Sequence, residues 1–253
     1  MIRTIDIVAR GNRWSRHHPL EKMVLYLGAL ILVMVAPRAH LPVAAALAAT
    51  MALGATLLLA RVKWRVFAGL IAVPAGFLLT SLGAMAISLD WSDGWHLGLA
   101  PNAWETIWPL ALRALATLTC LIGLATTTPV TDLLAFAGRI GLPAFLSDLA
   151  LMIYRQIWIT AEIMERSLAA QRARLGFAGY RGTLRSLGIA AATLFPRLLD
   201  RSQRIELGLA ARNFDGRLAF LRVGEALSAR RMAGVGGVLA LLMLLTLALP
   251  VTS

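Results

Sequence analysis

Long uncharged apolar runs constrain this chain more than any other feature of its sequence. A run of about 20 apolar residues has the length that a helix needs to cross the hydrocarbon core of a bilayer. The runs are Met23–Pro37, Leu41–Ala60, Val66–Leu89, Thr106–Thr131 and Met232–Pro250. The first is short, and the fourth contains a single charge, Arg113. Together they predict an all-α polytopic membrane protein with about five transmembrane helices.

The composition excludes several classes of protein. Apolar residues make up 58% of the chain and charged residues only 15%, whereas soluble domains have about 25% charged residues. The two lysines, Lys22 and Lys63, do not lie in the Gly-Lys-Ser/Thr sequence that a phosphate-binding loop requires, so the chain is not itself a P-loop ATPase. A single cysteine, Cys120, excludes an intrachain disulfide.

The net charge of +12 is explained by membrane orientation and does not require a nucleic-acid partner. With the N-terminus in the cytoplasm, 23 of the 25 basic residues fall on the cytoplasmic side, in residues 1–22, 61–65 and 126–231. The outer segment Asp90–Glu105 has three acidic residues and no Lys or Arg. Four tryptophans, Trp91, Trp95, Trp104 and Trp108, lie in or just after this segment, as is typical of a membrane boundary. We therefore expect a multi-pass protein of the bacterial inner membrane with a cytoplasmic N-terminus.

A large cytoplasmic segment separates the last two predicted spans. We divide the chain into residues 1–125, with the N-terminal stretch and four spans, residues 126–231, and the final span in residues 232–253. The middle segment reads as helices over roughly 133–140, 143–174, 183–192 and 194–212, punctuated by Gly and Pro. Its apolar content is high enough that residues 146–165 form a possible sixth, tilted membrane helix.

Residues 194–212 have the pattern of an amphipathic helix, with Pro196 in its first turn. The basic edge of this helix consists of Arg197, Arg201 and Arg204. Such a surface suits anionic lipid or the groove of a partner protein. A basic stripe of this kind is also what the positive-inside bias alone produces.

Two similar loci end two of the predicted helices. Each has small residues, an arginine and then a helix breaker, and they contain Ala173-Arg174-Leu175 and Ala211-Arg212-Asn213. An arginine presents a rigid five-donor fork to carboxylates or backbone carbonyls, and small neighbours let another surface come close. Each arginine also suits a helix C-terminus simply as a cation. Because the two contexts match, we favour docking into two equivalent sockets, which a dimeric partner would supply.

These residues resemble the transmembrane T component of energy-coupling factor ABC transporters, of the CbiQ type. The resemblance covers most of the chain, from the basic stretch that ends in His18-Pro19-Leu20-Glu21-Lys22 to the final span. Its most specific part is the pair of Ala-Arg-X motifs. The second family motif often reads Ala-Arg-Gly, and Asn213 departs from it, but Asn tolerates the left-handed conformation that Gly would take.

The resemblance implies a non-catalytic scaffold without a cofactor of its own. It implies that Arg174 and Arg212 dock into a dimer of CbiO-like ABC ATPases. From their positions in the sequence, we expect Arg172, Arg197, Arg201 and Arg204 to be further interface residues. Other implied partners are a CbiM-like membrane subunit, which binds the metal, and a small CbiN-like subunit. The implied cargo is cobalt, for cobalamin biosynthesis; nickel or a vitamin is the alternative.

Other residues support weaker hypotheses. Arg113 lies inside a predicted span, where a charge marks a functional site or pairs within the helix bundle. His40 and His96 fall on the outer side and are candidates for contact with an incoming metal, although surface histidines usually have no such role. A membrane-bound enzyme with a cytoplasmic active site would need convergent acidic or histidine residues, and a secondary carrier would show inverted repeats. The sequence has neither pattern.

Overall fold

The computed structural model describes residues 2–15, 17–90, 96–99, 103–138, 140–213 and 227–248. The chain forms two compact units. Residues 1–133 and 222–253 make the first, which we call the membrane unit, and residues 134–221 make the second, which we call the helical arm unit. The arm unit is thus an insertion between two parts of the membrane unit.

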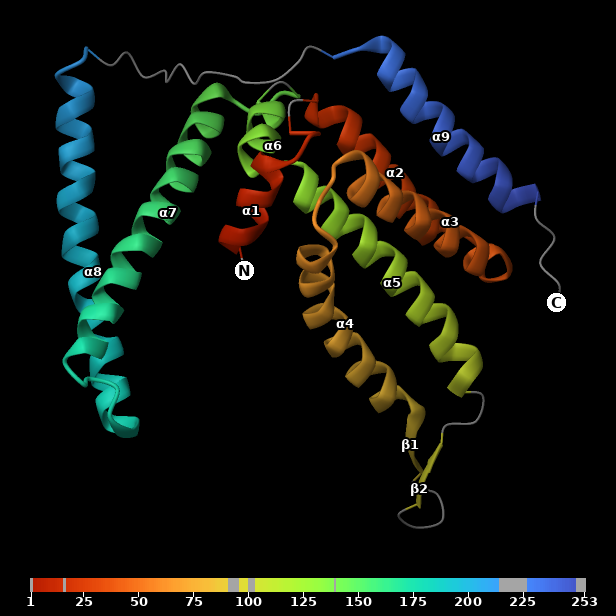
Figure 1. Cartoon of the computed structure of the whole chain (residues 1–253), viewed down its shortest axis with the longest axis horizontal. Coiled ribbons are helices and arrows are strands. Elements are labelled where there is room, and N and C mark those ends of the chain that lie inside the picture. The colour runs from red at the N-terminus through yellow and green to blue at the C-terminus, as the bar shows by residue number, and fades with distance from the viewer. Residues whose placement is uncertain are drawn as a thin grey trace. The chain divides into compact units, whose positions relative to one another are not determined.

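Helices dominate the membrane unit, as expected for an all-α membrane protein (Figure 1). Its elements are α1 (Ile2–Gly11), α2 (Pro19–Val35), the 3-10 turn η1 (Arg38–His40), α3 (Leu41–Gly54), the π-helical turn η2 (Ala55–Leu59), α4 (Trp64–Ala86), β1 (Ile87–Asp90), β2 (His96–Leu99), α5 (Ala103–Thr127) and α9 (Ala229–Ala248). Helix α6 (Val130–Ala137) follows α5 and crosses the boundary between the units.

Four helical segments of the described chain are long and apolar enough to cross a membrane: Arg38–Leu59, Trp64–Ala86, Trp104–Thr127 and Ala229–Ala248. The first predicted span corresponds to α2, which has 17 residues, the lower limit for a spanning helix. Helix α7 (Ala144–Ala173), which contains the possible sixth span at 146–165, is not among these four segments.

Helix α5 is the centre of the membrane unit, because it packs against α1, α2, α3 and α4. Helix α3 meets it through alanines spaced about one turn apart, and small side chains allow this close approach between helices in lipid. The buried alanines of this surface are Ala45, Ala48 and Ala52 of α3 and Ala55, the first residue of η2. Helix α9 packs on the other side, against α2 and α3.

A buried hydrogen bond joins the helices at the narrowest point of this packing. The hydroxyl groups of Tyr26 in α2 and Thr56 in η2 are 2.9 Å apart. Gly123 of α5 lies against both, and a Cβ atom at this position would be 2.5 Å from Tyr26 Cε1 and 2.8 Å from Thr56 Oγ1. A glycine is therefore required for α5 to come this close to α2.

Arg113 of α5 has a structural partner within the helix bundle. Its Nη2 donates to the carbonyl oxygen of Ala36 at a distance of 3.2 Å. Ala36 directly follows α2, and the last carbonyl groups of a helix lack donor partners within that helix and favour a nearby cation. Pairing within the bundle, one of the two roles considered for this arginine, is confirmed.

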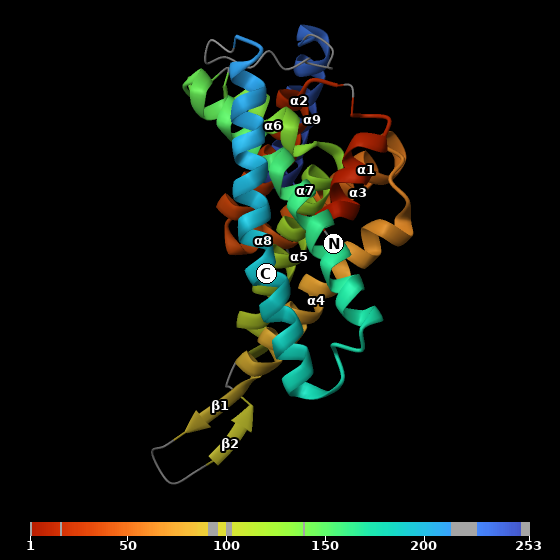
Figure 2. The same ribbon diagram turned by 90° about the vertical axis from the view of Figure 1, so that its left-hand side faces the viewer.

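A short hairpin connects α4 to α5, where the sequence predicted only a loop. Strands β1 and β2 pair antiparallel, with Ile87 opposite Leu99 and Asp90 opposite His96 (Figures 1 and 2). The predicted span over Val66–Leu89 is accordingly too long, because α4 ends at Ala86 and the chain becomes extended at Ile87. Trp104 and Trp108 stack at 5.3 Å between ring centroids, whereas Trp91 and Trp95 lie outside the described residues.

The arm unit is built from two long antiparallel helices, α7 (Ala144–Ala173) and α8 (Gly179–Ala210), which pack side by side (Figures 1 and 2). The prediction of separate helices at 183–192 and 194–212 is wrong, as is the placement of Pro196 in a first turn. Residues 179–210 form one helix with Pro196 inside it. A proline removes one backbone donor and strains the preceding turn, but the helix continues where the remaining hydrogen bonds suffice.

Substituting Gly123→Ala should destabilise the membrane unit, because the added methyl group overlaps Tyr26 and Thr56. Overpacking of this kind costs about 1–3 kcal/mol, so we expect the thermal unfolding midpoint in detergent to fall by several degrees. The matched control is Gly76→Ala in α4, where a Cβ atom has no neighbour within 4 Å. An equal decrease in both variants would contradict the close packing of α5.

Candidate functional site

The end of α7 places the first Ala-Arg-X motif in a Schellman turn. The N–H of Gly176 donates to the carbonyl of Gln171 at 2.9 Å, and the N–H of Leu175 donates to the carbonyl of Arg172 at 3.0 Å. These two bonds satisfy carbonyl groups that a helix C-terminus leaves open. Arg174 is the C-cap residue and is exposed, so its guanidinium group projects from the end of the helix.

Leu175 adopts an unfavourable backbone conformation in this turn. Its φ is 55°, in the left-handed region that the Schellman turn requires and that glycine normally fills. An L-residue with a Cβ atom loses about 1–2 kcal/mol in this conformation. Its side chain is nevertheless apolar and 81% exposed, directly beside Arg174. The first motif therefore presents a cation and an apolar side chain together.

Contacts from α8 and from the loop itself hold this turn in place. The buried hydroxyl group of Ser186 donates to the carbonyl of Gly176 at 2.6 Å. The guanidinium carbon of Arg172 lies 5.8 Å from the centre of the Phe177 ring, in a cation–π arrangement. The turn that carries Arg174 is therefore fixed to the body of the arm unit.

The second motif shares two backbone features with the first, although α8 ends at Ala210 and its C-cap residue is Ala211. The N–H of Asn213 donates to the carbonyl of Ala210 at 3.1 Å, as that of Leu175 does to Arg172, and the φ of Asn213 is 53°. Ala211, Arg212 and Asn213 are all exposed. The third residue of each motif is thus in the left-handed conformation and directly follows the arginine.

The antiparallel arrangement puts the two arginines at opposite ends of the arm unit. Helix α8 has 32 residues, so at 1.5 Å per residue its ends are about 48 Å apart. Helix α7 has 30 residues and runs in the reverse direction. An approximate two-fold axis perpendicular to the helices therefore relates one helix end to the other.

The remaining predicted interface residues are Arg172, near the end of α7, and Arg197, Arg201 and Arg204, within α8. Arg172 is in the last turn of α7, and Arg197 is exposed on α8. Arg204 forms an ion pair with Asp200 one turn away on the same helix, an exposed contact that contributes little stability.

The described residues contain no metal-binding group. Nowhere in this part of the chain do three or more His, Cys, Asp or Glu side chains come together as a candidate metal site. His40 ends η1, and His96 begins β2.

Comparison with known proteins places these features in a family. Residues 11–221 match the CbiQ family, described as cobalt transport proteins. The cobalt transport protein CbiQ of Rhodobacter capsulatus is 41% identical over 228 residues, which cover 90% of this chain and 91% of that protein. CbiQ of Salmonella typhimurium is 26% identical over 84% of this chain and 97% of its own length.

A third relative is a fused protein. The fused cobalt transport protein CbiMQ of Methanocorpusculum labreanum is 26% identical over 224 residues. The match covers 85% of this chain but only 37% of the fused protein. Most of that longer polypeptide therefore has no counterpart in this chain.

The left-handed backbone of Leu175 makes an unusual prediction about substitution by glycine. Leu175→Gly should stabilise the turn by about 1 kcal/mol, because it removes the cost of the positive φ, and should slow amide exchange at residues 175 and 176 about fivefold. The control is Leu184→Gly, an exposed leucine within α8, which should have the opposite effect on its own helix. Faster exchange at both sites, measured by mass spectrometry, would contradict the strained turn.

Proposed function

Because this chain belongs to the CbiQ family of cobalt transport proteins, we propose that it is the transmembrane scaffold of an energy-coupling factor ABC importer for cobalt. In this role it has no catalytic activity of its own. It couples ATP hydrolysis by partner ATPases to the release of a transition-metal ion into the cytoplasm. The importer lies in the bacterial inner membrane, with the N-terminus of this chain in the cytoplasm.

The observation that carries this proposal is the pairing of the two arginine-bearing helix ends. Arg174 and Arg212 lie at the ends of antiparallel helices, and each is followed by a left-handed residue whose N–H donates to the carbonyl three residues earlier. A surface that is repeated by an approximate two-fold axis suits a partner that is itself a two-fold dimer, because each end can then meet an equivalent socket. A dimer of CbiO-like ABC ATPases is such a partner, and carboxylates or carbonyls in its sockets would accept the guanidinium donors.

The same geometry supports a mechanism. When the ATPase dimer closes on ATP, its two sockets approach each other and the helix ends held in them must follow. Helices of 30 and 32 residues then act as levers on the membrane helices. We propose that the motion reaches a CbiM-like subunit, which holds the metal, and that a small CbiN-like subunit assists it. The basic edge formed by Arg197, Arg201 and Arg204 would contact the ATPases or anionic lipid.

The fused relative supports the choice of the membrane partner. Its printed name joins CbiM to CbiQ in one polypeptide, and this chain matches just over one third of it. Two proteins that are fused in one organism commonly act in one complex, so a separate CbiM-like subunit is the expected partner here. The family description favours cobalt as cargo over nickel or a vitamin. A membrane-bound enzyme remains the alternative of another class.

Charge reversal at both helix ends tests the docking. In Arg174→Glu/Arg212→Glu, a carboxylate meets sockets built for a cation, so we expect at least a tenfold loss of ATPase co-purified from membranes in mild detergent. Each single variant should retain one docked end and lose less. The control Arg65→Glu/Arg155→Glu makes the same change in net charge at exposed positions of α4 and α7, away from both arginine-bearing helix ends.

Two results would count against the proposal. If no ATPase accompanies the wild-type chain, the scaffold role is wrong. If the control double variant loses the ATPase as completely as the double variant at the helix ends, the attraction depends on net charge and not on Arg174 and Arg212. Uptake of radioactive cobalt with nickel as competitor then identifies the cargo.

A further inference from the structure

The chain passes between its two units twice, near residues 133 and 222. The covalent chain connects the arm unit to the membrane unit at these two points. Helix α5 precedes the first crossing, and α9 follows the second. The end of α5 and the start of α9 are both held by the first turn of α2, through two adjacent residues of opposite charge.

Lys22 holds the first crossing. Its side chain is 2% exposed, and its Nζ donates to the carbonyl oxygen of Thr127 at 3.0 Å. Thr127 is the last residue of α5, where carbonyl groups lack helical donors and the helix dipole favours a cation. The carboxyl group of Asp132 in α6 interacts with the same ammonium group. Burial raises the pKa of Asp132, and the charge of Lys22 acts against this increase.

Glu21 holds the start of α9, the first described helix after the second crossing, with a charge of the opposite sign. Its side chain is buried, and its Oε1 accepts from the N–H of Ser228 at 3.4 Å and lies 3.9 Å from Nε of Arg231. Ser228 directly precedes α9, where the first N–H groups have no helical acceptors and the dipole favours an anion. An anion therefore faces the start of one helix and a cation faces the end of another.

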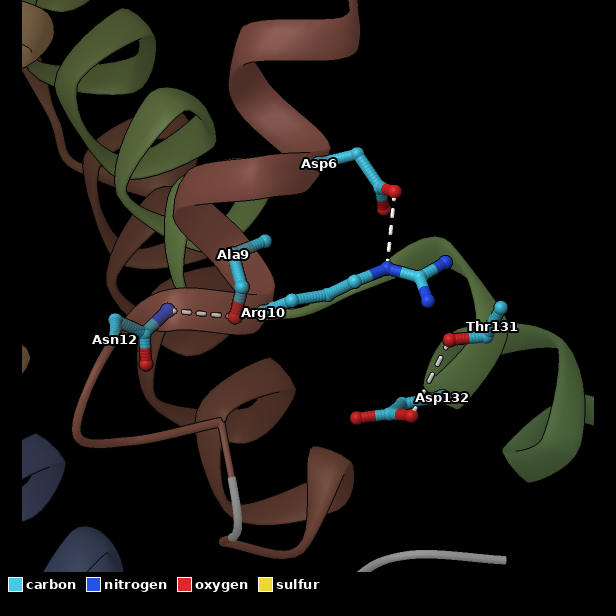
Figure 3. Close-up of polar contacts among 6 residues, drawn as sticks. All are labelled: Asp6, Ala9, Arg10, Asn12, Thr131 and Asp132. Carbon is cyan, nitrogen blue, oxygen red and sulfur yellow. Dashed lines mark hydrogen bonds and ion pairs between the residues drawn. The ribbon is translucent and has the colours of Figure 1, made fainter. Parts of the chain in front are cut away.

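Helix α1 adds a third contact to the first crossing. Nδ2 of Asn12 donates to the carbonyl of Thr126 at 2.9 Å and to that of Ala9 at 2.8 Å. Figure 3 shows the side chain of Arg10 extending from α1, with its ion pair to Asp6 on one side and Asp132 on the other. The end of α5 is thus enclosed by polar groups from α1 and α2.

Burying a charge between helices carries a large free-energy cost of desolvation. Replacing such charges by apolar side chains of similar volume is often neutral or stabilising, so stability alone does not explain them. Unlike an apolar contact, each charge binds a particular backbone group at one helix terminus and so fixes that terminus at one point. Both are placed on α2, a helix that packs against α3, α5 and α9.

We propose that Glu21 and Lys22 are positioning residues that fasten the end of α5 and the start of α9 to α2, so that movement of the arm unit is transmitted to the membrane helices. This inference rests on the proposed function for its transmission step. The fastening itself does not depend on that function. Loss of either residue should leave the complex assembled but reduce the amount of cargo moved for each ATP hydrolysed.

The test uses the complete transporter in proteoliposomes, with Lys22→Met and Glu21→Gln as variants. Each should lower cobalt uptake per ATP hydrolysed about fivefold or more, the lower end of the range for coupling between sites, while the amount of assembled complex stays at the wild-type level. Lys22→Arg, which keeps the charge, should recover most of the uptake. The matched controls are Lys63→Met and Glu105→Gln, at exposed positions.

Amide hydrogen exchange tests whether Glu21 and Lys22 hold the two helix ends, independently of whether they transmit movement. Lys22→Met should raise exchange in residues 127–133 and leave 228–232 unchanged, and Glu21→Gln should do the reverse. Unchanged exchange at both sites would overturn the fastening. Uptake that falls only in proportion to the assembled complex would reduce both residues to a structural role and overturn the inference. Absence of any ATPase from the wild-type complex would instead overturn the proposed function and its transmission step, whatever the exchange result.

Discussion

A buried polar group in the membrane unit must find its partner within the chain, because hydrocarbon supplies none. This constraint accounts for the way α2 is joined to its neighbours. At one end Lys22 and Glu21 meet the backbone at the termini of α5 and α9. In the middle the hydroxyl group of Tyr26 meets that of Thr56, and at the other end the carbonyl of Ala36 accepts from Arg113. The positions of these polar residues therefore fix the positions of the helices.

The apolar runs predicted most of the helical architecture, because a bilayer converts length and hydrophobicity directly into spanning helices. Where the structure departs from the prediction, a local signal for the start of a helix was misleading. Pro196 reads as a helix start, yet it lies inside α8, whose other turns supply enough hydrogen bonds to continue through it. The hairpin after α4 was not expected either, since its two short strands stabilise each other and carry little signal individually.

The candidate site was predictable in position but not in detail. Both Ala-Arg-X motifs end long helices, and Asn213 takes the left-handed conformation expected of an asparagine at that place. The same conformation at Leu175 was not predictable, because leucine disfavours it and only the bonds of the Schellman turn impose it. The roles of Glu21 and Lys22 were also hidden, since their partners are backbone atoms more than one hundred residues away.

The two helix ends share a left-handed third residue, but the side chains at that position differ. Beside its arginine one end carries an apolar leucine and the other a polar asparagine, in the same left-handed position. A partner with perfect two-fold symmetry that accepted both ends would meet a different surface in each half. Binding would therefore break the symmetry of that partner, so that two chemically identical subunits would acquire distinct environments and, with them, distinct affinities for whatever they bind.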